Sequence, residues 1–251
     1  MKSFKATCLM ATLALTLTLS GCGLPNYTLV AEDYVPYVYL DSNNKLTGFS
    51  TELVQAAMKE ENITKDIIVT PWTTIYNKLQ NTPNYIAFSV GRNAERENKF
   101  IWIAQVGTYT GSIYGLKNNK AVIKNLNDLK KYKIGTVKDH YTQNYLLKNG
   151  FKEGKNLFSI DADASSDATN VQKLIDKKID FLIANRRGID YIVKNNSNFS
   201  EKIKLFYTIK ELELPAYLAA SKGTSQEIID KFTEGFNKIK ANGIYDEIIN
   251  K

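Results

Sequence analysis

The chain has 251 residues, of which 43% are hydrophobic, and it carries a formal net charge of +7 at pH 7. This length allows one large domain or two modest ones, and the hydrophobic content excludes wholesale disorder. Two cysteines exclude a disulfide framework and a thiolate zinc cage, and a single histidine, His140, excludes a multi-histidine metal site. The basic excess suggests nucleic acid or an anionic membrane as a partner, and the positions of the charges test that interpretation.

The first 22 residues, MKSFKATCLMATLALTLTLSGC, have the pattern of an export signal. Two lysines precede an apolar, threonine-rich stretch from Cys8 to Leu19, which is shorter than the roughly 20 residues that span a bilayer. The ending Leu19-Ser-Gly-Cys22 resembles a bacterial lipobox, which implies cleavage before Cys22 and lipidation of its thiol. We therefore expect a lipoprotein signal peptide over 1–21 and an anchor and tether over 22–26. The alternative is an ordinary signal peptide with a chance cysteine.

Removal of this segment changes the charge argument. Without the two signal lysines the chain has 31 basic and 26 acidic residues, a net charge of +5. The remaining basic residues are interleaved with acids, and the sequence has no nucleic-acid-binding motif. No second apolar run of spanning length follows Cys22. We expect an exported protein that a lipid anchor holds on a bacterial membrane, at its periplasmic face or on the cell surface, and no nucleic-acid partner.

Short apolar runs alternate with segments of helical period, which predicts an α/β architecture with largely parallel sheets. The first set has strands at 28–31, 67–70 and 85–90, a helix through 53–58 with Ser50 or Thr51 as N-cap, and a helix over 72–79. A second set begins near Ile113, with strands at 133–137, 157–160 and 180–184 and helices at 141–148, 167–177 and 188–194. A strand at 216–221 and helices through 228–239 and 244–249 end the chain. Because no flexible linker separates the two sets, we expect two lobes that share strands or short hinges.

Two motifs suggest chemistry but fit it poorly. The run 161–167 resembles the start of a calcium loop, yet Ser166 replaces the glycine and Gln172 the glutamate, so a polar turn before a helix is the better interpretation. His140 follows Asp139, but no nucleophile motif accompanies them, and there is no phosphate-binding glycine loop. We expect no catalytic residue, no metal and no cofactor.

The segment after the strand at 85–90 is more specific. It places Arg92 and Arg96 four residues apart, where α/β proteins bind ligands at the carboxyl ends of strands. An arginine fork recognises a carboxylate through two parallel hydrogen bonds. The alternative is a pair of surface arginines that pair with Glu95 and Glu97.

Several short motifs occur in an order that resembles a known family. They are Leu29-Val-Ala-Glu32 with Tyr34-Val-Pro-Tyr37, Leu46-Thr-Gly-Phe49, Pro71-Trp72 with Leu79, Arg96 with Phe100 and Trp102, Leu126–Gly135, Lys178-Ile-Asp180 and Tyr217–Lys222. From Tyr27 to the C-terminus the chain resembles the family 3 extracellular solute-binding proteins of ABC transporters, which bind polar amino acids.

The resemblance implies a two-lobed periplasmic-binding-protein-like α/β fold of type II, a Venus flytrap with two hinge crossings. Lobe 1 is expected over 27–108 and 212–251, and lobe 2 over 109–211. It further implies a monomeric receptor, not an enzyme, that captures a small carboxylate-bearing solute between the lobes. The solute is expected to be an amino acid or a relative of one, and the partner an ABC permease in the inner membrane.

The resemblance also implies site residues. Arg96 would grip the ligand's carboxylate with support from Ser89 and the Gly91 amide. Tyr34 and Trp72 would stack on the ligand or form a wall of its site, although packing in the core is an equal alternative for Trp72. Asp139 and Tyr141 lie where the family has a Gly-Thr-Thr turn in lobe 2.

Three positions depart from the family's pattern. Gly91 replaces a Ser or Thr, Arg92 is an additional cation, and Asn185 replaces the aspartate that holds an α-ammonium. Either Asp139 or Glu32 supplies the missing negative charge, or the ligand is an organic anion without an ammonium.

Two other functions remain open at this point. The fold also serves enzymes of the cyclohexadienyl-dehydratase type, for which Glu32 or Asp139 would have to be the acid. It also serves ligand-sensing subunits that signal to a membrane kinase.

Overall fold

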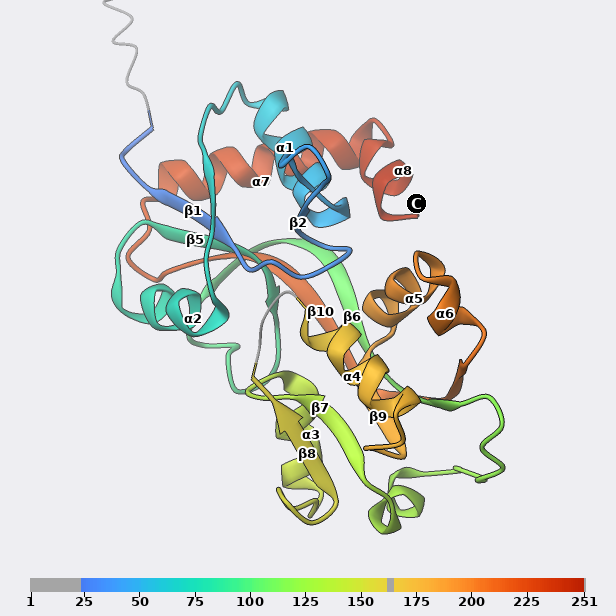
Figure 1. Cartoon of the computed structure of the whole chain (residues 1–251). Coiled ribbons are helices and arrows are strands. Elements are labelled where there is room, and N and C mark those ends of the chain that lie inside the picture. Colours follow the sequence, from blue (N-terminus) through green and yellow to red (C-terminus); the bar gives the residue numbers. More distant parts are fainter. Residues whose placement is uncertain (1–23, 162–164, 251) are drawn as a thin grey trace, which may run out of the picture.

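The computed structural model describes residues 24–161 and 165–250 (Figure 1). The predicted signal peptide and the predicted lipidation site, Cys22, fall outside the described residues, as does the middle of the polar turn at 161–167. Among the described residues, no helix is both long and apolar enough to cross a membrane.

One mixed sheet runs through the molecule. Its strands, in spatial order, are β4 (Ile67–Val69), β1 (Thr28–Ala31), β5 (Tyr85–Gly91), β10 (Ile203–Ala220), β6 (Ile101–Leu116), β9 (Phe181–Asn185), β7 (Ile134–Val137) and β8 (Leu157–Ile160). Pairing is parallel at each end, where β1 pairs with β4 and β5, and β7 pairs with β8 and β9. The predicted parallel sheets therefore exist at the two ends. In the middle, the long strands β6 and β10 pair antiparallel with each other, and with β9 and β5 respectively.

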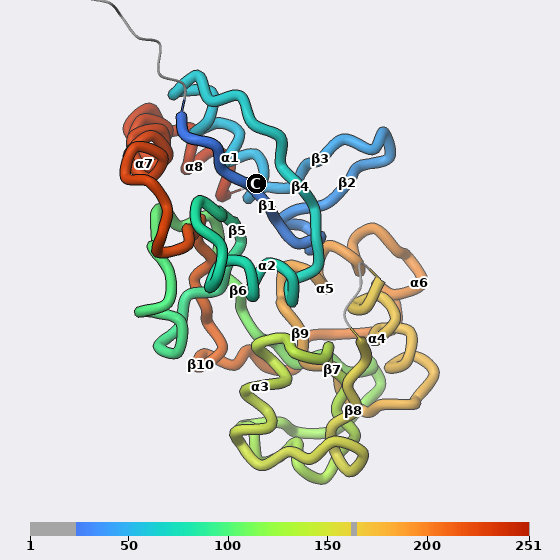
Figure 2. Tube along the Cα trace, turned by 90° about the vertical axis from the view of Figure 1, so that its left-hand side faces the viewer, coloured from blue at the N-terminus to red at the C-terminus, as the bar shows by residue number. Residues whose placement is uncertain are grey.

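The two long strands connect two lobes (Figures 1 and 2). β6 and β10 pair over their whole length, from Ile101 with Ala220 to Leu116 with Ile203. Their register shifts between Thr208 and Glu213, at the level where the chain passes from one lobe to the other. This arrangement is the two-lobed type II fold with two crossings. The sequence pattern had predicted only the end of β10 and had predicted no strand in the region of β6.

The first lobe packs α1 (Phe49–Glu60), α7 (Gln226–Ala241) and α8 (Ile244–Ile249) on one side of its strands, with α2 (Trp72–Asn81) near β5 (Figure 1). Leu53, Phe232 and Phe236 are buried in its core. A Cβ on Gly235 would lie 2.3 Å from the Ala57 carbonyl oxygen, so glycine allows α7 to approach the α1 backbone. A short hairpin of β2 (Tyr39–Leu40) and β3 (Leu46–Thr47) precedes α1.

The predicted N-cap of α1 is wrong. The helix begins at Phe49 after Gly48, whose φ of 106° favours glycine, and Ser50 and Thr51 lie inside the first turn. Both are buried, and the Ser50 hydroxyl donates a hydrogen bond of 2.7 Å to the Val106 carbonyl oxygen. The hydroxyl therefore ties the helix to β6 instead of capping it.

The second lobe contains α3 (Tyr141–Lys148), α4 (Ser166–Ile175), α5 (Arg186–Lys194), α6 (Ser197–Ser200) and a 3-10 helix at Leu126–Lys131. Two apolar clusters hold it together, one around Ile134 and Phe181 and one around Leu182 and Ile189. The helices α3, α4 and α5 confirm the helical periods of the sequence. Each follows a strand of this lobe, α3 after β7, α4 after β8 and α5 after β9.

Candidate functional site

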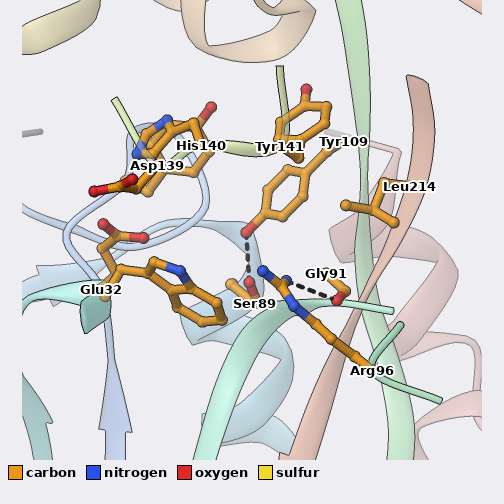
Figure 3. Close-up of a pocket in the computed structure, with 11 residues that line it drawn as sticks. Glu32, Ser89, Gly91, Arg96, Tyr109, Asp139, His140, Tyr141 and Leu214 are labelled. Atoms are coloured by element: carbon orange, nitrogen blue, oxygen red, sulfur yellow. Dashed lines mark hydrogen bonds between the residues drawn. The ribbon is translucent and has the colours of Figure 1, made fainter. Parts of the chain in front are cut away.

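A cavity lies where the two lobes meet. The first lobe contributes the loop after β1, the start of α2, the end of β5 and the loop after it, and the second contributes the loop before α3. The strands β6 and β10 complete the wall. Figure 3 shows the lining residues, which are Glu32, Tyr34, Trp72, Ser89, Gly91, Arg96, Tyr109, Asp139, His140, Tyr141 and Leu214.

Arg96 supplies the positive charge of this cavity. Its Nη1 donates a hydrogen bond of 3.1 Å to the Gly91 carbonyl oxygen, and its guanidinium lies 4.8 Å from the Trp72 ring and 5.1 Å from the Tyr76 ring. Burial lowers the pKa of Arg96 from its usual value, and a guanidinium remains charged near neutral pH. No carboxylate among the described residues forms an ion pair with it. Most of its N–H groups are therefore available to an anion.

Two hydroxyl groups at the cavity have no hydrogen-bond partner among the described residues. They are the Ser89 Oγ and the Tyr141 hydroxyl, and both are buried. Ser89 has a φ of 60°, and its carbonyl oxygen accepts a hydrogen bond of 2.6 Å from the Tyr109 hydroxyl. A buried hydroxyl without a partner is costly, so these two groups suit a polar ligand atom.

Gly91 leaves room for this arrangement. A Cβ at this position would lie 2.5 Å from the Cδ2 of Leu214 and 3.6 Å from the Nη1 of Arg96. A serine or threonine here would require the Leu214 side chain to move. The glycine is thus matched to the leucine that faces it from β10.

The opposite side of the cavity is acidic. Glu32 and Asp139 lie across from Arg96 in Figure 3. Burial, with a smaller contribution from Asp33, raises the pKa of Glu32 to about 7, while the backbone N–H of Trp72 partly opposes this shift. Asp139 has a φ of 61°, and its backbone N–H donates to the Gln143 Oε1 at 2.7 Å.

Aromatic rings form the remaining wall. Tyr34 stacks on Tyr37 with ring centroids 5.7 Å apart, and it makes edge contacts with Tyr109 and His140. Tyr141 of the second lobe stacks on Tyr109 at 5.8 Å. Burial lowers the pKa of His140 to about 4, so the imidazole is neutral at pH 7. The site therefore offers one cation, two carboxyl groups and apolar ring faces.

Eight of the ten residues that the sequence suggested for ligand binding line this cavity. They are Glu32, Tyr34, Trp72, Ser89, Gly91, Arg96, Asp139 and Tyr141. The sequence analysis did not propose Tyr109, His140 or Leu214 as ligand-binding residues. Tyr109 and Leu214 lie on the two crossing strands, where no motif marks them.

Arg92 and Asn185 lie elsewhere. Arg92 pairs with Glu97 through two hydrogen bonds of 2.8 and 2.5 Å, and its guanidinium lies 5.4 Å from the Trp102 ring. The Asn185 Oδ1 accepts hydrogen bonds from the Tyr37 hydroxyl and the Thr110 backbone N–H, at 3.3 and 3.2 Å. Asn185 therefore links β9 to the crossing strand β6 and to the first lobe.

Comparison with known proteins covers almost the whole chain. The family model of the bacterial extracellular solute-binding proteins, family 3, matches residues 28–251. A probable histidine-binding protein of Campylobacter jejuni is 24% identical over 239 residues, which are 94% of this chain and 85% of the relative.

Solved structures share the fold. One is the sensor domain of a histidine kinase, with similarity to periplasmic binding proteins. It has a TM-score of 0.75 at 19% identity, and the match covers 88% of this chain and 93% of the sensor-domain chain. Another is an ancestral arginine-binding protein bound to arginine. It has a TM-score of 0.74 at 22% identity, and the match covers 90% of this chain and 97% of the arginine-binding chain. These relatives are named as binding or sensing proteins, not as enzymes.

Proposed function

Because the chain belongs to the bacterial extracellular solute-binding proteins of family 3, we propose that it captures an amino acid, or a related small carboxylate, in the cavity between its lobes. It would then deliver this solute to an ABC permease, as a monomeric receptor that the lipidated Cys22 anchors to the membrane. The relatives named as histidine-binding and arginine-binding proteins support the amino-acid class of ligand.

One observation carries this proposal. The Arg96 guanidinium has no carboxylate partner among the described residues, and the unpartnered hydroxyls of Ser89 and Tyr141 line the same cavity. A ligand carboxylate would accept two parallel hydrogen bonds from the Arg96 guanidinium and has further lone pairs for the Ser89 hydroxyl. The Tyr141 hydroxyl points away from Arg96 (Figure 3) and would meet another polar atom of the ligand. Arg92 does not compete for the ligand, since Glu97 already neutralises it.

We propose that closure of the two lobes links ligand binding to transport. We assign 27–108 and 212–251 to lobe 1 and 109–211 to lobe 2, so that Arg96 belongs to one lobe and Tyr141 to the other. A ligand that contacts both lobes favours the closed arrangement over an open one. The permease then distinguishes loaded from empty protein by this difference in shape.

A second candidate is the sensor subunit of a membrane kinase. The histidine kinase sensor domain, with its TM-score of 0.75, is the observation that favours it. Ligand capture is the same in both cases, and only the partner differs. Purification of the lipidated protein from its own membranes, after cross-linking, would recover a permease in the first case and a kinase in the second.

We expect the substitution Arg96→Ala to weaken binding by about 2–5 kcal/mol, the range for removal of one partner of a buried charge pair. The measurement is isothermal titration calorimetry of the soluble domain, after a thermal-shift screen of amino acids and organic acids. A ligand at 100 times its Kd stabilises a protein by about 2.7 kcal/mol, which such a screen detects readily.

Arg92→Ala is the matched control, because it removes an arginine from the same loop but not from the cavity. The affinity of this variant for the ligand should stay within twofold of the wild-type affinity. Equal affinities for Arg96→Ala and the wild type would contradict the proposed function.

A further inference from the structure

The chain enters the first lobe through residues that lie against its core. Leu24 packs against the apolar cluster of this lobe. Tyr27 is buried, and its ring meets that of Phe232 edge to face at 6.1 Å. Thr28 then begins β1, which has a partner strand on each side in the sheet. The chain is therefore held by the first lobe from Leu24 onward.

A groove lies beside this entry point, and we refer to it as the anchor face. It is lined by the entering chain, the turn after α1 and two residues of α7, which are Leu24–Tyr27, Glu61–Lys65, Glu227 and Lys231. Asn62 and Thr64 are exposed on it. The lining has two acidic and two basic side chains, so its charges balance and an anionic lipid surface would not be repelled.

The proposed lipid anchor is very close to this face along the chain. Only Gly23 stands between Cys22 and Leu24 in the sequence. Two residues of fully extended chain span at most about 7 Å, so the Cα of Cys22 stays within that distance of the Leu24 Cα however the chain is arranged. Two or more acyl chains hold a lipidated residue stably at the membrane surface. Leu24, and the anchor face around it, must then lie at the surface of the bilayer.

We propose that the protein rests on a phospholipid bilayer through the anchor face, with the first lobe against the membrane and the second lobe pointing away from it. The start of β1 lies at one end of the molecule, and α3 and β8 lie at the opposite end (Figures 1 and 2). A tether this short cannot carry the ligand cavity to a permease in a different membrane, so the permease must be in the bilayer that holds the anchor. This inference rests on the proposed function, because it requires lipidation of Cys22.

Fluorescence quenching tests which end of the molecule lies near the bilayer. The lipidated protein, purified from bacterial membranes, is reconstituted into phosphatidylcholine vesicles that contain a lipid with a nitroxide on its headgroup. A dye is attached at Thr64→Cys on the anchor face, or at Lys155→Cys in the exposed loop between α3 and β8. Because the proposed processing removes Cys8 and acylates Cys22, the introduced cysteine is the only free thiol. We expect quenching of the Thr64 dye to be at least threefold stronger than that of the Lys155 dye.

A longer tether is the matched control. Insertion of about 20 glycine and serine residues after Gly23 keeps the lipidation motif and the whole first lobe, and such a linker has a root-mean-square length of about 25 Å. The variant should float with the vesicles as the wild type does. Quenching should become similar at the two dye positions, because the longer tether no longer fixes which end of the molecule faces the bilayer.

Equal quenching at the two positions in the wild type, stronger quenching at Lys155, or a pattern that the longer tether leaves unchanged overturns the inference. In each of these cases the protein still floats with the vesicles, so the proposed lipid anchor stands. If the wild type does not float, the lipid anchor of the proposed function fails and this inference fails with it. Titration of Arg96→Ala tests ligand capture independently of either result.

Discussion

Tyr109 and Tyr141 stack on each other at the cavity, but their hydroxyl groups are in different situations. The Tyr109 hydroxyl donates to the Ser89 carbonyl oxygen at 2.6 Å, whereas the Tyr141 hydroxyl has no hydrogen-bond partner among the described residues. Loss of a made hydrogen bond destabilises the fold, and loss of an unmade one does not. We therefore expect a structural role for the Tyr109 hydroxyl and propose a ligand-binding role for the Tyr141 hydroxyl.

We expect Tyr141→Phe to leave the Tm of the ligand-free protein unchanged or slightly higher, because no internal hydrogen bond is lost. The same change should weaken ligand binding about twofold to tenfold, since a hydrogen bond contributes roughly 0.5–1.5 kcal/mol. Calorimetric titration and thermal unfolding measure the two effects.

Tyr109→Phe provides the comparison. It leaves the Ser89 carbonyl oxygen without its donor, so the Tm of the ligand-free protein should fall by about 2–4 °C for each kcal/mol lost. A lower Tm in Tyr141→Phe than in Tyr109→Phe would show that the Tyr141 hydroxyl has an internal role.

Single residues differ in how far the sequence predicts their place. Arg92 and Arg96 are of one type and lie in one loop, and the family motif pointed to Arg96 as the ligand-binding one. The alternative, in which the arginines pair with Glu95 and Glu97, is correct for Arg92 and Glu97 and not for Arg96. The sequence could not separate the two cases, because a pair five residues apart depends on the turn of the loop.

Helices and strands were predicted best where the spacing of apolar residues is regular. The strands β1 and β8 and the helix α3 have the predicted ends, because apolar runs and helical spacing are clear there. β6 and the first part of β10 were not predicted. Their burial pattern is irregular, since each strand leaves one lobe, crosses the hinge and enters the other, so no single face stays buried.

Glu61 connects two elements of the first lobe. It is the C-cap residue of α1, its side chain is only 3% exposed, and it forms ion pairs with Lys231 and Lys238 of α7, at 2.8 and 2.5 Å. The hydrogen bond from Lys231, and then that from Lys238, lowers the pKa of Glu61. The ionised carboxylate is thus favoured by folding.

We expect Glu61→Gln to lower the Tm by a few degrees at pH 7. Because the pKa is lower in the folded state, the stabilisation is fully present above the unfolded value of about 4.5 and is lost as pH falls through the folded value. The difference in Tm between wild type and variant should therefore shrink between pH 5 and pH 3. A difference that stays constant over this range would contradict the role of the charge.

At the scale of the whole molecule, contacts outside the ligand cavity also join the lobes. The Arg187 guanidinium of α5 lies 4.9 Å from the Phe49 ring, and its Nη2 donates a hydrogen bond of 3.3 Å to the Ile249 carbonyl oxygen. Tyr39 and Tyr191 meet at 5.6 Å across the same gap. These contacts exist only when the lobes are together, so they favour closure whatever the ligand is.

Arg187→Ala should therefore weaken the binding of every ligand by the same factor. The apparent affinity scales with the population of the closed state, and a cation–π contact with one hydrogen bond contributes roughly 1 kcal/mol, which corresponds to about threefold to tenfold. Titrations with several amino acids measure the factor. Arg186→Ala is the matched control, because the Arg186 guanidinium pairs only with Asp190 on its own helix among the described residues. A loss confined to one ligand would place Arg187 at the ligand itself, and no loss would show that these contacts do not contribute to closure.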